Sequence, residues 1–174
     1  MDWITLITGT IIILVFSWFY SVKHGRFHGI PRFFSFESIF ILLVINLKPW
    51  FHDPFSMLQI ISWICLILSA YFGITGFFLL RKIGKPDTNF ENTTVLVKTG
   101  LYALIRHPLY SSLVFLGTGI MLKDPGILQV VLGLVNLIAL FITARVEEKE
   151  MTGRFGDEYS EYMKETKMFI PFIL

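Results

Sequence analysis

The residues from Pro108 to Ala144 are PLYSSLVFLGTGIMLKDPGILQVVLGLVNLIALFITA, in which two apolar runs are joined by the polar segment from Lys123 to Gly126. Pro108 suits the first turn of a helix, where its missing N–H costs nothing, and Pro-Gly is a frequent tight turn. Neither run carries a charge in its middle, as is typical of segments that cross a bilayer. The stretch therefore predicts a helical hairpin, 108–122 and 127–144, whose two free ends lie at the same membrane surface.

Three further apolar runs precede the hairpin, at residues 3–22, 33–47 and 55–80. The chain has 174 residues, of which 54% are hydrophobic and 16% charged, whereas soluble domains carry about 25% charged residues. We expect an all-α, polytopic membrane protein with about five transmembrane helices and a cytoplasmic C-terminal helical and aromatic segment. We expect residues 1–174 to form a single domain, with N-terminal transmembrane helices in 1–80 and a polar, reactive core in 81–174.

Charges at the ends of the runs predict their orientation. Basic residues follow the first run rather than precede it, so we expect a retained helix and not a cleaved secretory signal. If the N-terminus faces outside, residues 23–32, 81–107 and 145–174 face the cytoplasm and hold 13 of the 15 Lys and Arg residues. This distribution fits the positive-inside rule. Glu37 lies near the start of the second run, and we expect it at the membrane interface.

Composition and charge argue against several other kinds of site. The net charge of +2, without a basic stripe interleaved with aromatics, argues against nucleic-acid binding. Cys65 is the only cysteine, so no internal disulfide can form and we expect no zinc or iron–sulfur site. We interpret Cys65 as a packing residue of an apolar run.

Two polar segments meet at the predicted cytoplasmic end of the hairpin. Arg106 and His107 directly precede its first helix, and Glu147 and Glu148 follow its second. The two pairs are distant in sequence, but the hairpin makes them neighbours in space. Each has an ordinary interpretation, since Arg106 could contact lipid headgroups and the glutamates could end a solvated helix. Ionisable groups that converge at a membrane boundary are costly unless paired or functional, so the combination favours a ligand pocket.

The residue types in this pocket favour a ligand that carries both charges. A carboxylate such as Glu147 can bind an ammonium group, and Arg106 or an N–H of His107 can bind a carboxylate. Tyr102 and Tyr110 can contact a sulfonium by cation–π attraction, or can belong to an aromatic belt. S-adenosylmethionine carries an ammonium, a carboxylate and a sulfonium, and we expect it to be the cofactor.

The order and spacing of these residues resemble the isoprenylcysteine carboxyl methyltransferase and phospholipid methyltransferase superfamily. The matching motifs are Thr99-Gly100-x-Tyr102, Arg106-His107-Pro108-x-Tyr110, Glu147-Glu148, Phe155-Gly156-x-x-Tyr159-x-x-Tyr162 and the closing Phe169-Ile170-Pro171. The resemblance covers residues 85–174, whereas the first half matches only as generic membrane helices. It implies an integral membrane enzyme that uses S-adenosylmethionine to methylate a lipophilic acceptor, a prenylcysteine-type carboxylate or a related lipid, with 81–174 as its cofactor-binding catalytic core.

The resemblance and the residue chemistry together give the candidate site residues. Catalytic roles are expected for Arg145, Glu147 and His107, although Arg145 lies closer to the glutamates than the substrate-linked arginine of the family. The expected cofactor contacts are Thr94, Val95, Leu96, Val97, Gly100, Tyr102, Arg106, His107, Pro108, Leu109, Tyr110, Glu147 and Glu148. The expected partners are membrane lipid and a lipophilic small molecule or lipidated substrate.

Two other classes of protein fit parts of the pattern. Sterol-type reductases that use NADPH share an Arg-His-Pro motif and a glycine-aromatic tail, but they are usually longer, and we see no extra region for a dinucleotide here. A non-enzymatic membrane scaffold would also be polytopic, whereas a transporter should carry ionisable residues in mid-membrane. Prenylated cysteine, phosphatidylethanolamine, an isoprenoid acid and a small thiol all stay open as methyl acceptors.

Overall fold

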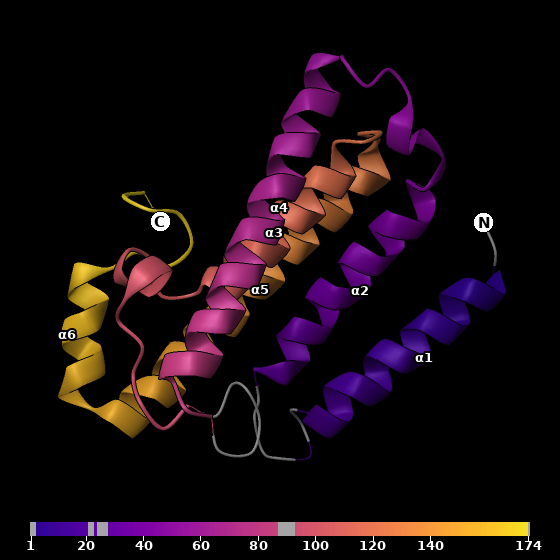
Figure 1. The fold of residues 1–174 in the computed structure, drawn as a ribbon. Helices are drawn as coiled ribbons and strands as arrows, with labels where there is room; N and C mark the ends of the chain where they lie inside the picture. Colours follow the sequence, from indigo (N-terminus) through magenta and orange to yellow (C-terminus); the bar gives the residue numbers. More distant parts are fainter. Residues whose placement is uncertain (1–2, 21–22, 24–27, 87–92, 174) are drawn as a thin grey trace.

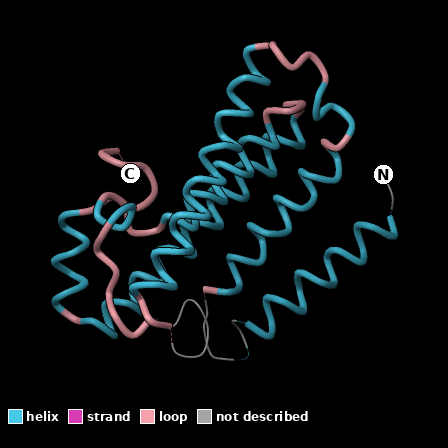
Figure 2. The backbone as a smooth tube through the Cα atoms, in the orientation of Figure 1, coloured by secondary structure: helices cyan, strands magenta, loops and turns pink. Residues whose placement is uncertain are grey.

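The computed structural model describes residues 3–20, 23, 28–86 and 93–173, and this part of the chain is helical, as the sequence predicts. The α-helices are α1 (Trp3–Tyr20), α2 (Gly29–Ile45), α3 (Met57–Ile83), α4 (Pro108–Met121), α5 (Ile127–Phe155) and α6 (Asp157–Glu165), with short 3-10 helices η2 (Lys48–Phe51) and η3 (Gly100–Ala103). α3, α4 and α5 form a central group, with α2 and then α1 on one side and α6 on the other (Figure 1). Most of the described loops lie at the ends of the helices (Figure 2).

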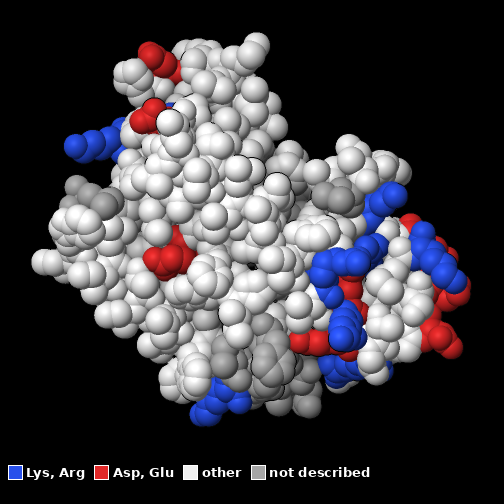
Figure 3. Space-filling model, turned by 180° about the vertical axis from the view of Figure 1, so that it is seen from behind, with Lys and Arg blue, Asp and Glu red and all other residues white. Residues whose placement is uncertain are grey.

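Two of the described helices, α3 and α5, are long and apolar enough to cross a membrane by length and composition. α1 and α4 are apolar but shorter. The 14 residues of α4 make a helix of about 21 Å, against a hydrocarbon core of about 30 Å. Most charged side chains visible in Figure 3 lie on the side of α6, and the wide surface beyond it carries few. The membrane character is therefore supported, while the number of spans stays a prediction.

The predicted hairpin is confirmed as α4 and α5. α4 begins at Pro108, and α5 begins at Ile127 after the polar turn. α5 continues past the apolar run to Phe155, so it carries the glutamate pair on a rigid helix. Gly156 then ends α5 and starts α6 with φ of 57°, a backbone conformation that favours glycine.

Small and polar residues hold the bundle together. Oγ of Ser62 in α3 donates a 2.6 Å hydrogen bond to the carbonyl oxygen of Gly119 in α4, where a Cβ would come within 2.9 Å of α3. The Oδ1 of Asn136 in α5 accepts a 2.6 Å hydrogen bond from Oγ of Ser35 in α2. Nδ2 of Asn136 donates to the carbonyl oxygen of Leu113 in α4 over 3.1 Å. Such contacts are the usual means by which helices associate in lipid.

Glu37 lies in the middle of α2, whereas the sequence predicted it near the start of a helix. α2 begins at Gly29, before the predicted Phe33, so Glu37 lies in the middle of the helix. Its Oε1 accepts a 2.6 Å hydrogen bond from Oγ1 of Thr10 in α1. The predicted run starts at Phe33, whereas α2 begins earlier and includes Pro31, because proline is tolerated in the first turn of a helix. The position of Glu37 relative to a membrane interface stays a prediction.

The chain after α6 returns to the start of α4. The backbone N–H groups of Arg106 and His107 donate to the carbonyl oxygens of Lys167 (2.8 Å) and Met168 (3.1 Å). The N–H of Lys167 in turn donates to the carbonyl oxygen of Leu104 over 3.1 Å. The segment that carries Arg106 and His107 is therefore fixed by backbone hydrogen bonds that link parts of the chain far apart in sequence.

Candidate active site

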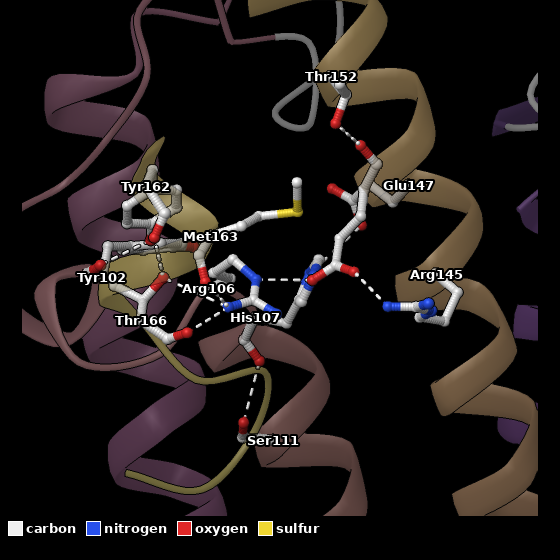
Figure 4. A network of polar contacts seen from close by, with 11 residues as sticks. Tyr102, Arg106, His107, Ser111, Arg145, Glu147, Thr152, Tyr162, Met163 and Thr166 are labelled. Atoms are coloured by element: carbon white, nitrogen blue, oxygen red, sulfur yellow. Dashed lines mark hydrogen bonds and ion pairs between the residues drawn. The ribbon is translucent and has the colours of Figure 1, made fainter. Parts of the chain in front are cut away.

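Arg106 and Glu148 form a buried ion pair between the start of α4 and the polar part of α5. Nε of Arg106 donates a 2.6 Å hydrogen bond to Oε1 of Glu148 (Figure 4). The two side chains are only 9% and 5% exposed. Nη1 of Arg106 also donates to the carbonyl oxygens of Met163 and Thr166, at the end of α6. The guanidinium is therefore engaged by protein acceptors and joins α4, α5 and α6.

His107 is buried beside both glutamates. Its Nδ1 lies 3.8 Å from Oε2 of Glu147, and its ring stacks on that of Tyr110 with centroids 5.3 Å apart. Its Nε2 lies 3.5 Å from Oε1 of Glu148 but makes no hydrogen bond within the described part of the chain. A buried polar nitrogen without a hydrogen bond is costly, so Nε2 is a candidate ligand contact.

Three tyrosines from η3 and α6 complete the polar side of the site. The hydroxyl of Tyr162 donates a 2.6 Å hydrogen bond to the carbonyl oxygen of Tyr102, and the ring of Tyr159 packs edge-on against that of Tyr162. Burial raises the pKa of all three phenols, and the Glu147 carboxylate raises the pKa of Tyr102 and Tyr159 further. The three rings are therefore neutral at physiological pH.

These groups border a cavity of about 350 Å³ whose walls come from α2, α3, α4, α5, α6 and the segment that precedes α4. Its volume is within the range of small-molecule sites. The lining residues that the sequence predicted are Leu96, Val97, Tyr102, Arg106, His107, Leu109, Tyr110 and Glu147. The other lining residues are Arg32, Phe36, Gly73, Phe77, Leu80, Thr93, Ser112, Leu113, Met151, Tyr159 and Tyr162. One end of the cavity is polar, and its remaining walls are mainly apolar.

The predicted cofactor stretch from Thr94 to Val97 divides into two parts. Leu96 and Val97 line the cavity, whereas Thr94 and Val95 are exposed and lie outside its lining. Oγ1 of Thr94 instead donates to the carbonyl oxygen of Lys85, across the loop that leads to η3. Thr94 therefore helps to shape the loop that carries the lining residues.

Three more predicted cofactor contacts, Gly100, Pro108 and Glu148, also lie outside the cavity lining. Gly100 has φ of 62°, and a Cβ there would come within 2.8 Å of Cδ1 of Leu79, so the backbone requires glycine. Pro108 is buried in the first turn of α4, and Glu148 binds Arg106. These three residues therefore contact other parts of the protein and do not border the cavity.

Arg145, predicted to be catalytic, lies on the outer face of α5. Its side chain is 65% exposed, and its Nη1 lies 3.5 Å from Oε2 of Glu148. It borders a shallow groove with Phe141 and Lys149. Arg145 therefore does not border the cavity, and its ion pair is with Glu148, the neighbour of the lining residue Glu147. Among the described residues, no three side chains of His, Cys, Asp or Glu form a group that could hold a metal ion.

Sequence reasoning missed the contributions of α2, α3 and α6 to the cavity. Tyr159 and Tyr162 were visible in the Phe-Gly-x-x-Tyr motif but were given no site role. Arg32 was counted only as a topology charge, although it is 5% exposed and lines the cavity. A basic residue one turn before an aromatic, as in Arg32 and Phe36, was the available signal for α2.

The model of the phospholipid methyltransferase family matches residues 57–158, more than half of the chain. This chain belongs to the phospholipid methyltransferase family. The match begins at α3, upstream of the motifs that carry the resemblance. α3 is therefore part of the family core, consistent with its place in the wall of the cavity. The phospholipid methyltransferase family includes relatives that are named for methylating different atoms, sulfur in some and oxygen in others.

The chain is similar to the methanethiol S-methyltransferase of Crocosphaera subtropica, with 30% identity over 155 residues that cover 79% of this chain and 59% of that protein. It is similar to the protein-S-isoprenylcysteine O-methyltransferase of Saccharomyces cerevisiae, with 39% identity over 89 residues that cover 49% of this chain and 36% of that protein. The corresponding Homo sapiens protein is 38% identical over 125 residues, 68% of this chain and 40% of that protein. The chain thus spans less than two thirds of the length of these relatives. No solved structure matches it significantly.

Proposed function

We propose that this protein is an integral membrane methyltransferase that uses S-adenosylmethionine to methylate a lipophilic acceptor, a prenylcysteine-type carboxylate or a related lipid. The observation that carries the proposal is that Glu147 and His107, 3.8 Å apart, stand at the polar end of a mainly apolar cavity. Such a cavity suits a charged methyl donor at one end and a lipophilic acceptor along its walls. Membership of the phospholipid methyltransferase family supports this reaction class.

The residues at the polar end fit S-adenosylmethionine. Glu147 would bind its ammonium group, and the unbonded Nε2 of the buried His107 would gain a hydrogen-bond partner. The rings of Tyr102, Tyr110 and Tyr159 line the cavity and would face the sulfonium. When bound, S-adenosylmethionine would supply an electrophilic methyl group on its sulfur.

The chain's part in methyl transfer is alignment and exclusion of water, because the reaction is an in-line displacement. Phe36, Phe77 and Leu113 line the apolar walls and would keep water away from the reacting atoms. A carboxylate acceptor needs no general base. An amine acceptor would have to lose a proton, and Glu147 or His107 would accept it.

We also propose the topology and the domain organisation. α1 to α5 would span the membrane, with the N-terminus outside and the polar end of the cavity facing the cytoplasm, in keeping with the positive-inside distribution. Residues 1–174 would act as one domain. The cavity draws lining residues from both 1–80 and 81–174, which supports a single unit. Arg145 would act on the site indirectly, by positioning Glu148.

The test begins with expression of the full chain in a host, followed by mass spectrometry of lipid extracts for a gain of one methyl group. The purified chain in nanodiscs is then supplied with S-adenosylmethionine and one of three acceptors: a prenylcysteine carboxylate, phosphatidylethanolamine or a small thiol. We expect methylation of a lipophilic acceptor, its loss in Glu147→Gln, and its retention in Lys149→Gln, an exposed position on the same helix. Absence of methyl transfer to every acceptor would contradict the proposal.

A further inference from the structure

Tyr159 is a buried residue of the cavity wall whose hydroxyl makes no hydrogen bond within the described part of the chain. It is only 3% exposed. The other two buried phenols at the polar end have partners. The hydroxyl of Tyr162 donates to the carbonyl oxygen of Tyr102 over 2.6 Å, and the hydroxyl of Tyr102 donates to that of Gly76 over 3.5 Å. Of the three, Tyr159 therefore has the hydroxyl that a ligand can engage.

We propose that the hydroxyl of Tyr159 donates a hydrogen bond to the carboxylate of the methyl donor, so that Tyr159 and Glu147 together bind its amino-acid head. The inference rests on the proposed function and deepens it, because it assigns a binding residue that the sequence did not predict. It also states which part of S-adenosylmethionine the polar end of the cavity recognises.

The ring of Tyr159 is held at the cavity by its surroundings. Tyr159 and Tyr162 are both buried and lie three residues apart on α6, a spacing that places them on one face of the helix. Their rings pack edge-on with centroids 5.7 Å apart. The bond from Tyr162 to Tyr102 ties α6 to η3, and the bond from Arg106 to the carbonyl oxygen of Met163 ties it to the start of α4. Tyr159 is thus positioned before a ligand binds.

Glu147 lines the same cavity, and it acts electrostatically on Tyr159. Burial is the main cause that raises the pKa of Tyr159, and the Glu147 carboxylate is the next. An interaction between charges weakens with distance, so this effect indicates that the two groups are close. A phenol beside a carboxylate keeps its proton, so the hydroxyl stays a donor. The polar end thus offers an anionic acceptor and a neutral donor side by side.

This pair of groups matches the head of an α-amino acid, which carries its ammonium and its carboxylate on the same carbon. If Glu147 binds the ammonium, the carboxylate lies beside it and needs a hydrogen-bond donor, because a carboxylate taken out of water without one is costly. The hydroxyl of Tyr159 meets that need, and a hydrogen bond to a charged acceptor is stronger than one between neutral groups. The ligand in turn gives the buried hydroxyl a partner.

Arg106 supports an anionic group at this position without replacing the hydroxyl. Its Nε and Nη1 already donate to Glu148 and to carbonyl oxygens at the end of α6. Against burial and the two glutamates, which raise the pKa of Tyr159, the Arg106 guanidinium lowers it. Its positive field therefore reaches the hydroxyl, where it would stabilise a bound carboxylate.

The test removes the hydroxyl from the protein and the carboxylate from the ligand, separately and together. Calorimetry in nanodiscs measures the affinity for S-adenosylmethionine and for decarboxylated S-adenosylmethionine, which keeps the ammonium, the sulfonium and the nucleoside. The proteins are wild type, Tyr159→Phe, Glu147→Gln and, as the control, Tyr71→Phe at a 54% exposed position of α3.

We expect Tyr159→Phe to weaken S-adenosylmethionine binding about 10-fold, the effect of a hydrogen bond to a charged group. Its affinity for the decarboxylated ligand should equal that of wild type, which also shows that the variant is folded. Glu147→Gln should weaken the binding of both ligands, because both carry the ammonium. Tyr71→Phe should change neither affinity.

Unchanged S-adenosylmethionine affinity in Tyr159→Phe, or an equal loss with both ligands, would overturn the inference. Wild type supplies a measurement that needs no variant: it should bind the decarboxylated ligand about 10-fold more weakly, and equal affinities would also overturn the inference. A folded wild type that binds neither ligand contradicts the proposed function itself, which is a distinct outcome.

Discussion

Glu147 and Glu148 are adjacent on α5 but face different surroundings. Glu148 is 5% exposed and binds Arg106 over 2.6 Å, whereas Glu147 is 23% exposed and lines the cavity beside His107. Successive residues of a helix point about 100° apart, so one carboxylate can form the buried ion pair while its neighbour lines the cavity. In keeping with the proposed function, we expect Glu148 to stabilise the fold and Glu147 to bind the ligand.

Loss of Glu148 should destabilise the protein. Glu148→Ala leaves the guanidinium of Arg106 buried without its carboxylate, and removing one partner of a buried ion pair costs about 3 kcal/mol. Thermal unfolding of the purified chain in detergent should show a clear fall in the midpoint. The matched control is Glu161→Ala, which removes the exposed pair with Lys164, and exposed pairs contribute at most about 1 kcal/mol. Equal midpoints for Glu148→Ala and Glu161→Ala would show that the Arg106 pair does not brace the fold.

The three buried tyrosines should make the fold sensitive to alkaline pH. Burial raises the pKa of Tyr102, Tyr159 and Tyr162 above its value in the unfolded chain, so the folded state keeps protons that the unfolded state loses. This contribution to stability is complete below about pH 10, the pKa of a free tyrosine, and falls as the pH rises further.

The measurement is the unfolding midpoint as a function of pH, followed in wild type and in Tyr159→Phe. We expect a decline above about pH 10 that is shallower in Tyr159→Phe, because the variant has one phenol fewer to titrate. A pH dependence unaffected by the substitution would count against a buried, neutral Tyr159.

The hydrogen bond between Ser35 of α2 and Asn136 of α5 should couple the two helices. In a double-mutant cycle with Ser35→Ala and Asn136→Ala, we expect a coupling of about 1 kcal/mol, as for other hydrogen bonds between membrane helices. The control is the same cycle with Ser38→Ala in place of Ser35→Ala. Oγ of Ser38 donates to the carbonyl oxygen of Phe34 in its own helix. The same coupling for Ser38→Ala, or none for Ser35→Ala, would contradict the bond between helices.

Local sequence signals were sufficient to predict the hairpin and the meeting of its polar ends. Pro108 and the turn to Gly126 define where α4 and α5 begin, and an antiparallel hairpin brings the free ends of its two helices to the same side. The proximity of His107 and Glu147 follows from that geometry. Which carboxylate faces the cavity depends on the rotation of α5 about its axis, which packing against α2 and α4 decides.

Contributions from distant elements could not be predicted in the same way. Arg32 and Phe36 reach the cavity because α2 packs on α5, a contact that no local pattern encodes. Glu37 has its hydrogen-bond partner, Thr10, on another helix, so no local pattern could predict this contact either. The hydroxyl of Tyr162 reaches Tyr102 only because α6 folds back after Gly156.

The central claim, that the cavity holds S-adenosylmethionine against Glu147 and His107, is tested most directly by calorimetric titration of the cofactor into the purified full chain. We predict binding by wild type and by Lys149→Gln, and affinity about 10- to 100-fold weaker in Glu147→Gln and in His107→Phe, which keeps the stacking on Tyr110. Wild-type affinity in both Glu147→Gln and His107→Phe, or no binding by the folded wild type, would contradict the account.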